Sequence, residues 1–96
     1  MRLVLRPLVE RDLDEAARWY EARQAGLRER FLGDFEAVLV RIEENPFLHP
    51  TVHRAIRRAP LGDFPYGIFY VQIQDEIRVL GVVHDARHPS VWRRRR

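Results

Sequence analysis

Residues 68–84 have the sequence IFYVQIQDEIRVLGVVH, in which a polar triplet separates two apolar runs. The runs Ile68–Ile73 and Ile77–His84 are rich in β-branched and aromatic residues, and Gln74-Asp75-Glu76 suits a tight turn. The pattern therefore predicts a β-hairpin. Because apolar residues occupy both faces of each run, we expect these two strands to be the central strands of a sheet.

Two amphipathic helices are predicted upstream of this hairpin. Pro7 introduces the first, Gly26 ends it, and Asn45-Pro46 ends the second, because proline cannot continue a helix. The apolar positions at helical spacing are Val9, Leu13, Ala16, Ala17 and Tyr20 in the first helix and Leu27, Phe31, Phe35, Val38, Leu39 and Ile42 in the second. A turn this short predicts an antiparallel helical hairpin.

The remaining segments complete the predicted order. Arg2–Arg6 is a short apolar run stopped by proline, which favours a strand, and Arg54–Arg58 is a second, weaker strand candidate. Phe47–Val52 is predicted to be a connecting loop. The fold class is therefore α+β: an N-terminal strand, an antiparallel helical hairpin, then a three-stranded antiparallel meander, with the helices on one sheet face.

Length and composition define the class of protein. The chain has 96 residues and 46% apolar residues, which predicts one domain, residues 1–96, with a true core. No apolar run is long enough to span a membrane, and the N-terminus lacks the apolar segment of a signal peptide. The absence of cysteine excludes disulfides and thiolate metal sites. The expected compartment is the cytoplasm.

Charge is distributed unevenly along the chain. All 17 basic residues are arginine, and nine of them lie beyond Asn45 together with only four acidic residues. This basic second half favours a polyanionic or acidic-protein partner. The alternative is a solvated surface followed by a flexible basic tail at 93–96.

Metal and nucleotide chemistry find little support. The chain has no phosphate loop, nucleophile elbow or glycine-rich fingerprint. It holds two histidine pairs at His-x3-His spacing, which are His49 with His53 and His84 with His88. The first pair straddles Pro50, and the second leaves a strand beside Asp85 and meets Pro89 without a third ligand. We expect no metal and no cofactor.

Arginines on the predicted strands form a stronger constellation. The target-binding candidates are Arg54, Arg57, Arg58, Arg78, Arg87 and Trp92. We expect the arginines to converge on the sheet face that the helices leave bare, where guanidinium groups bind phosphate or acidic groups of a protein. With His84 as a proton donor or acceptor, Arg58, Arg78 and Arg87 form a candidate nuclease site. The alternative role is to keep the sheet soluble.

Aromatic residues have two possible uses here. Tyr66, Phe69 and Tyr70 occupy positions suited to filling the core beneath the helices, although aromatic side chains also stack on bases. Trp92 lies in the basic tail, so it is the one aromatic residue that we expect to contact a partner.

Several motifs together resemble the RelE/ParE superfamily, and more closely its ParE-like branch of plasmid stabilisation proteins. They are Asp12-Leu13, Trp19-Tyr20, Phe31, Asn45-Pro46, Arg57-Arg58, Phe64-Pro65-Tyr66, Ile68-Phe69-Tyr70 and His84-x-x-Arg87-x-Pro89-x-x-Trp92. The resemblance covers essentially the full chain. It implies the fold predicted above and the toxin of a type II toxin–antitoxin pair.

The resemblance also implies partners. An antitoxin would fold its C-terminal segment on this chain, along the outer groove of the helical hairpin or along a sheet edge. The resemblance implies DNA gyrase as the target of ParE-like members, whereas RelE-like members cleave mRNA in the ribosome. Self-association as a homodimer is left open.

Two departures weigh against the nuclease activity. The chain has no lysine, and Asp85 follows His84 where an aromatic acid–base partner is expected. An acid at that position would repel the scissile phosphate. We therefore predict a non-nucleolytic, ParE-like toxin, with a ribosome-dependent mRNA endonuclease using Arg58, Arg78, His84 and Arg87 as the alternative. A binding module without toxicity is the third hypothesis.

Overall fold

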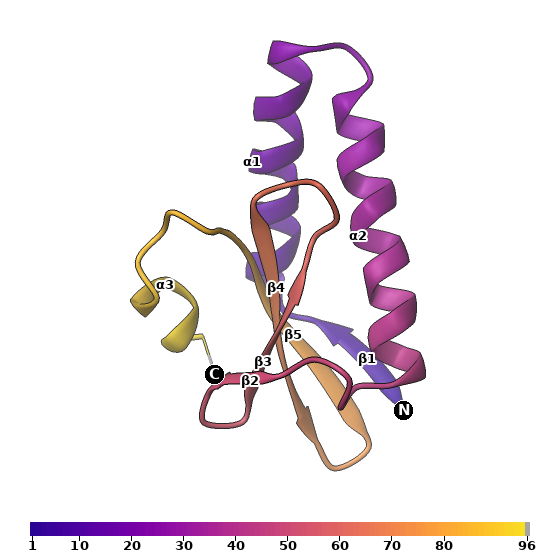
Figure 1. Cartoon of the computed structure of the whole chain (residues 1–96), viewed down its shortest axis with the longest axis vertical. Helices are drawn as coiled ribbons and strands as arrows, with labels where there is room; N and C mark the ends of the chain where they lie inside the picture. The colour runs from indigo at the N-terminus through magenta and orange to yellow at the C-terminus, as the bar shows by residue number, and fades with distance from the viewer. Residues whose placement is uncertain (96) are drawn as a thin grey trace.

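A five-stranded sheet carries two long helices on one face and a short helix on the other (Figure 1). The structure is a computed structural model and describes residues 1–95. The elements are β1 (Arg2–Leu5), α1 (Pro7–Arg23), α2 (Leu27–Glu44), β2 (Thr51–His53), β3 (Ile56–Pro60), β4 (Tyr66–Ile73), β5 (Glu76–His84) and α3 (Ser90–Arg93). The strand order is β1-β5-β4-β3-β2, with β1 parallel to β5 and the other pairs antiparallel. The predicted α+β fold is confirmed.

The helical hairpin forms as its sequence predicts. Pro7 begins α1, and Gly26 takes a left-handed conformation (φ 94°) in the turn to α2. The Glu21 carboxylate accepts hydrogen bonds from the amides of Gly26 (3.1 Å) and Arg28 (3.0 Å). These bonds satisfy amides at the start of α2 and lower the pKa of Glu21. The helix then ends at Glu44, before Asn45-Pro46.

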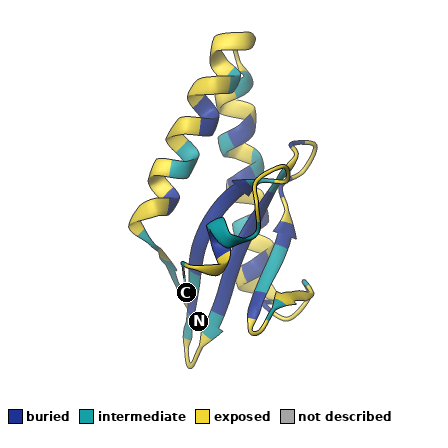
Figure 2. Ribbon diagram, turned by 90° about the vertical axis from the view of Figure 1, so that its left-hand side faces the viewer, coloured by how far each residue is buried: buried dark blue, intermediate teal, exposed yellow. Residues whose placement is uncertain are grey.

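The β4–β5 hairpin is buried on both faces, as expected for the central strands. Ile68 and Tyr70 of β4 belong to the core beneath α1 and α2, whereas Phe69 and Val71 belong to a second cluster on the opposite face. In β5 every residue from Val79 to Val83 is buried (Figure 2). The register shifts where Phe69 pairs with Gly81 and Tyr70 pairs with Val79, so Leu80 is the extra residue of a bulge.

The sheet face opposite the helical hairpin is partly covered, contrary to our expectation that it is bare. There α3 folds back over the sheet, and the Trp92 ring stacks on Phe69 with 4.3 Å between centroids and 13° between planes. Trp92 is 8% exposed. Trp92 is therefore part of a buried cluster, because the apolar outer face of β4 and β5 binds this ring.

Several boundaries differ from the prediction. Thr51–His53 pairs with β3 as strand β2, although Thr51 and Val52 fall in the predicted loop, so the meander has four strands. The strand predicted at Arg54–Arg58 begins at Ile56, because Arg54 takes a positive φ of 51° in the turn before it. At the predicted tail 93–96, Arg93 ends α3 and Arg95 makes an ion pair, and residue 96 lies outside the described residues.

The α2–β2 connection is held against the sheet by two hydrogen bonds. The buried Tyr70 hydroxyl donates to the Pro46 carbonyl (2.8 Å), and the Arg57 guanidinium donates to the His49 carbonyl (2.6 Å). The His49 Nε2 atom is buried and has no hydrogen-bond partner among residues 1–95. Burial, reinforced by the nearby charge of Arg41, lowers the pKa of His49.

We predict that Tyr70→Phe lowers the free energy of unfolding by about 1 kcal/mol, because the Pro46 carbonyl loses its buried donor. Urea denaturation measures this change. Tyr66→Phe is the matched control, since within the described chain the Tyr66 hydroxyl donates no hydrogen bond. Equal losses in the two variants would contradict the assigned role of Tyr70.

We also predict that stability falls as the pH is lowered through the ordinary histidine pKa near 6.5. The pKa of His49 is lower in the folded state, so the unfolded chain takes up its proton first and is favoured by acid. The loss begins near the unfolded pKa and stops growing below the folded one. His49→Gln should flatten this part of the profile in urea titrations at several pH values. An unchanged profile would show that another group is responsible.

Candidate functional site

A groove of about 590 Å³ lies between α1, the end of β5 and α3. Its walls combine aromatic, acidic and basic side chains. The lining residues are Asp12, Glu15, Ala16, Trp19 and Tyr20 from α1, Pro65 and Tyr66 at the start of β4, Val82, Val83 and His84 from β5, and Arg87, Val91 and Arg95 beyond it.

The early end of β1 determines where this groove forms. β1 pairs with β5 only as far as Leu5 opposite Val79, and the last residues of β5 have no strand on that side. The Asp12 carboxylate takes the place of a neighbouring strand there, because its Oδ2 atom accepts a hydrogen bond from the Val82 amide (2.9 Å). One side chain of α1 therefore satisfies the open edge of the sheet.

Arg95 completes this arrangement from the C-terminal side. Its guanidinium contacts both carboxylate oxygens of Asp12, at 2.5 and 3.2 Å, and donates to the Leu80 carbonyl (3.4 Å). Both side chains are largely buried, at 16% and 14% exposure. Gly81 makes this approach possible, because a Cβ there would lie 2.4 Å from an Arg95 nitrogen. The ion pair joins α1, β5 and the C-terminal segment.

The position of His84 follows from an aromatic cluster. Tyr20, Phe31, Phe64 and Tyr66 pack with centroid distances between 4.8 and 6.2 Å, and the Tyr66 ring meets His84 edge-on at 5.1 Å. The His84 Nδ1 atom accepts a hydrogen bond from the Ala86 amide (2.9 Å), so a neutral His84 carries its proton on Nε2.

Tyr66 is a neutral phenol in this groove. Burial raises its pKa, Tyr20 and Asp12 raise it further, and Arg87 opposes them. A phenol whose pKa lies above the ordinary value of about 10 does not serve as a base near neutral pH. The groove therefore offers hydrogen-bonding groups and aromatic surface.

The predicted arginines do not converge on one point. Arg58 lies on the α3 face, and its guanidinium binds Asp85 (2.6 Å). The Arg58 side chain passes over Gly67, where a Cβ atom would lie only 2.5 Å from the Arg58 Nε atom. Arg78 lies on the same face but pairs with Glu76, which also binds Arg2.

Both arginines are thus neutralised within the chain. Hydrogen bonds from Arg78 and then Arg2 lower the pKa of Glu76, so its carboxylate stays charged. Arg58 in β3 lies opposite Phe69 of β4, and Arg78 in β5 lies opposite Val71 of β4, so strand β4 runs between the two arginines. Ordinary strand spacing then separates their Cα atoms by roughly 12 Å.

The other candidates lie elsewhere. Arg57 belongs to the opposite face, where it lies over the Phe47 ring at 5.2 Å, and Arg54 is exposed in the β2–β3 turn. Arg87 lines the groove together with His84. The structure brings these two residues together in the groove, whereas Arg58 and Arg78 lie on the other face of the sheet and are paired with acidic residues.

Sequence reasoning missed Asp12 and Arg95 as groove residues. Asp12 appeared only within a family motif, and Arg95 only within an arginine run. Within residues 1–95 no group of histidine and acidic side chains is arranged to hold a metal ion. No helix in this part of the chain is long and apolar enough to cross a membrane.

Comparisons with known proteins agree with this architecture. A family model described as the ParE toxin of the type II toxin–antitoxin system parDE matches residues 3–89. A solved chain of a chromosomal ParDE TA system from P. aeruginosa superposes with a TM-score of 0.67 at 17% sequence identity, over 88% of this chain and 95% of that chain. At this identity the likeness concerns the fold alone. No curated protein sequence matches significantly.

We predict that Asp12→Ala lowers the free energy of unfolding by about 2 to 4 kcal/mol, because it leaves Arg95 and the Val82 amide without their buried partner. Asp14→Ala is the matched control, since Asp14 makes a more exposed pair with Arg18 on the same helix and should cost less than about 1 kcal/mol. Urea denaturation compares the two variants. Similar small losses would contradict the role of Asp12 at the sheet edge.

Proposed function

The chain belongs to the ParE toxin family of type II toxin–antitoxin systems, and we propose that it stops growth by binding DNA gyrase and that an antitoxin protein neutralises it. The matched family covers residues 3–89, so nearly the whole domain carries the relationship. The resemblance noted in the sequence is thereby confirmed. The proposed target acts in the cytoplasm.

One observation carries the choice of a binding toxin over a nuclease. Cleavage of a phosphodiester needs a proton acceptor and charge-stabilising groups within reach of the same phosphate. Arg58 and Arg78 are instead engaged by Asp85 and Glu76, and His84 faces the helical side of the sheet beside Tyr66. This separation supports a toxin that acts by binding.

Arginines on the surface are the proposed contacts to the target. Arg54 and Arg87 are exposed, and Arg57, Arg58 and Arg78 are half-buried. Trp92 contributes indirectly, because its buried ring holds α3 against the sheet. An acidic patch on a large enzyme would complement such a set.

We predict that induced expression arrests growth with a DNA-damage response and intact transcripts, and that co-expression of the neighbouring gene product restores growth. Purified protein should also inhibit supercoiling by gyrase. His84→Ala should remain toxic, because His84 has no chemical role in this proposal. Phe31→Asp, which places a charge in the core, should be inactive and serves as the unfolded control.

Other outcomes separate the alternatives. Cleaved transcripts, lost in His84→Ala, would replace the proposal with the ribosome-dependent endonuclease. Growth without arrest, when the folded protein accumulates, would leave a binding module without toxicity. Arrest that the neighbouring gene product does not relieve would refute the proposed antitoxin.

A further inference from the structure

A second cleft, of about 480 Å³, lies between the start of α1 and α3. It is formed by the two ends of the chain, and it shares Val91 and Arg95 with the groove described above. The lining residues are Arg6, Pro7, Leu8, Leu80, Val91, Arg94 and Arg95. We call this site the terminal cleft.

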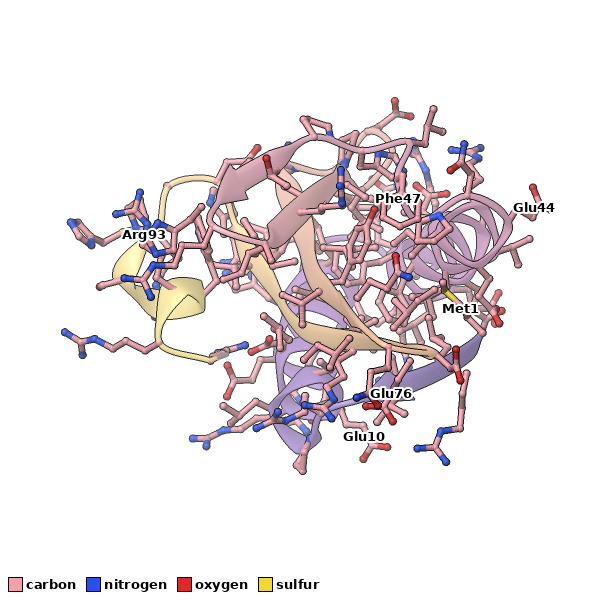
Figure 3. All side chains as sticks on the ribbon, turned by 90° about the horizontal axis from the view of Figure 1, so that it is seen from below. Met1, Glu10, Glu44, Phe47, Glu76 and Arg93 are labelled. Carbon is pink, nitrogen blue, oxygen red and sulfur yellow. The ribbon has the colours of Figure 1, made fainter. Side chains whose placement is uncertain are left out.

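The terminal cleft has an excess of positive charge. Three of its lining residues are arginines and none is acidic. Asp12 neutralises Arg95 from the adjacent groove, whereas within residues 1–95 neither Arg6 nor Arg94 makes an ion pair. Arg93, next to them on α3, points outward from the molecule (Figure 3). An anionic group entering the terminal cleft would therefore meet two unpaired guanidinium groups.

The remaining lining residues are apolar. Leu8 is 41% exposed although it is a large aliphatic residue, and it lines the cleft together with Val91. Trp19 is 51% exposed eleven residues further along α1, about 16 Å away at helical rise, and it lines the adjoining groove. Leu8 in the terminal cleft and Trp19 in the groove thus expose apolar side chains along α1, and the basic C-terminal segment lines both surfaces as well.

We propose that the terminal cleft binds an acidic, amphipathic segment of a protein partner. Carboxylates of that segment would pair with Arg6 and Arg94, and a neighbouring apolar side chain would pack against Leu8 and Val91. This inference rests on the proposed function, because it identifies the partner as the antitoxin.

The chemistry of the cleft favours a peptide over a nucleic acid. Its lining residues include no aromatic ring on which a base could stack, and its surface is largely aliphatic. A peptide with separate acidic and apolar residues fits both the charge and the apolar surface.

The test uses the full chain and the purified product of the neighbouring gene. Arg6→Glu and Arg94→Glu should each weaken binding roughly tenfold, because each replaces an attraction by a repulsion. Leu8→Asn should weaken binding as well. Arg28→Glu is the matched control, since it makes the same charge change at the start of α2, remote from the terminal cleft, and should leave binding unchanged.

The folding of each variant is verified by thermal unfolding. Arg6 precedes the first turn of α1, where an acidic residue suits the helix dipole, so the fold should be preserved. Affinity that is equal in wild type, Arg6→Glu and Arg94→Glu would overturn the terminal cleft as the docking site. Absence of binding by the wild type would instead refute the antitoxin proposal. Binding of a duplex oligonucleotide that Arg6→Glu abolishes would overturn the peptide assignment.

Discussion

The two-sided apolar surface of the β4–β5 hairpin is the constraint on which the rest of this domain depends. Ile68 and Tyr70 face one way and Phe69 and Val71 the other, so each face needs a cover. Full burial of each large apolar side chain contributes about 1.5–3 kcal/mol. The helical hairpin covers one face, and Trp92 covers part of the other. A four-residue helix has no stability of its own, so its burial against Phe69 fixes α3 in place.

A second constraint arises at the edge of the sheet. Because the chain turns into α1 directly after β1, the last part of β5 has no strand beside it. Unpaired backbone groups at such an edge need partners, and Asp12 and Arg95 provide them from opposite ends of the chain. The same ion pair lies where the groove that holds His84 adjoins the terminal cleft, because Arg95 lines both. Both surfaces are therefore consequences of a short first strand.

Local patterns in the sequence predicted the elements that are stabilised locally or are long. The two helices and the β4–β5 hairpin have strong periodicity, and their prediction was confirmed. β2 has three residues and follows Pro50, so its pairing with β3 depends on tertiary structure. Likewise, α3 depends on the apolar face that it covers, and nothing in residues 90–93 alone identifies it.

The candidate site was harder to predict because side-chain direction depends on register. Arg57 and Arg58 are neighbours in β3, yet they lie on opposite faces of the sheet, since strand side chains alternate. The His84 ring likewise belongs to the helical face, whereas Arg58 and Arg78 belong to the other face. Asp12 and Arg95 are 83 residues apart, so no spacing rule connects them. Strand assignment alone therefore could not show which arginines share a surface.

The fold also changes the meaning of the basic second half. Arg58, Arg78 and Arg95 are paired with Asp85, Glu76 and Asp12, so much of the excess charge is used inside the domain. Arginines without an acidic partner act on a binding partner mainly at close range, because salt screens exposed charges beyond about 8–10 Å. A partner is then selected by a few carboxylates placed beside apolar groups, and a long polyanion gains little from this surface. The arrangement of charge thus argues for recognition of a protein segment.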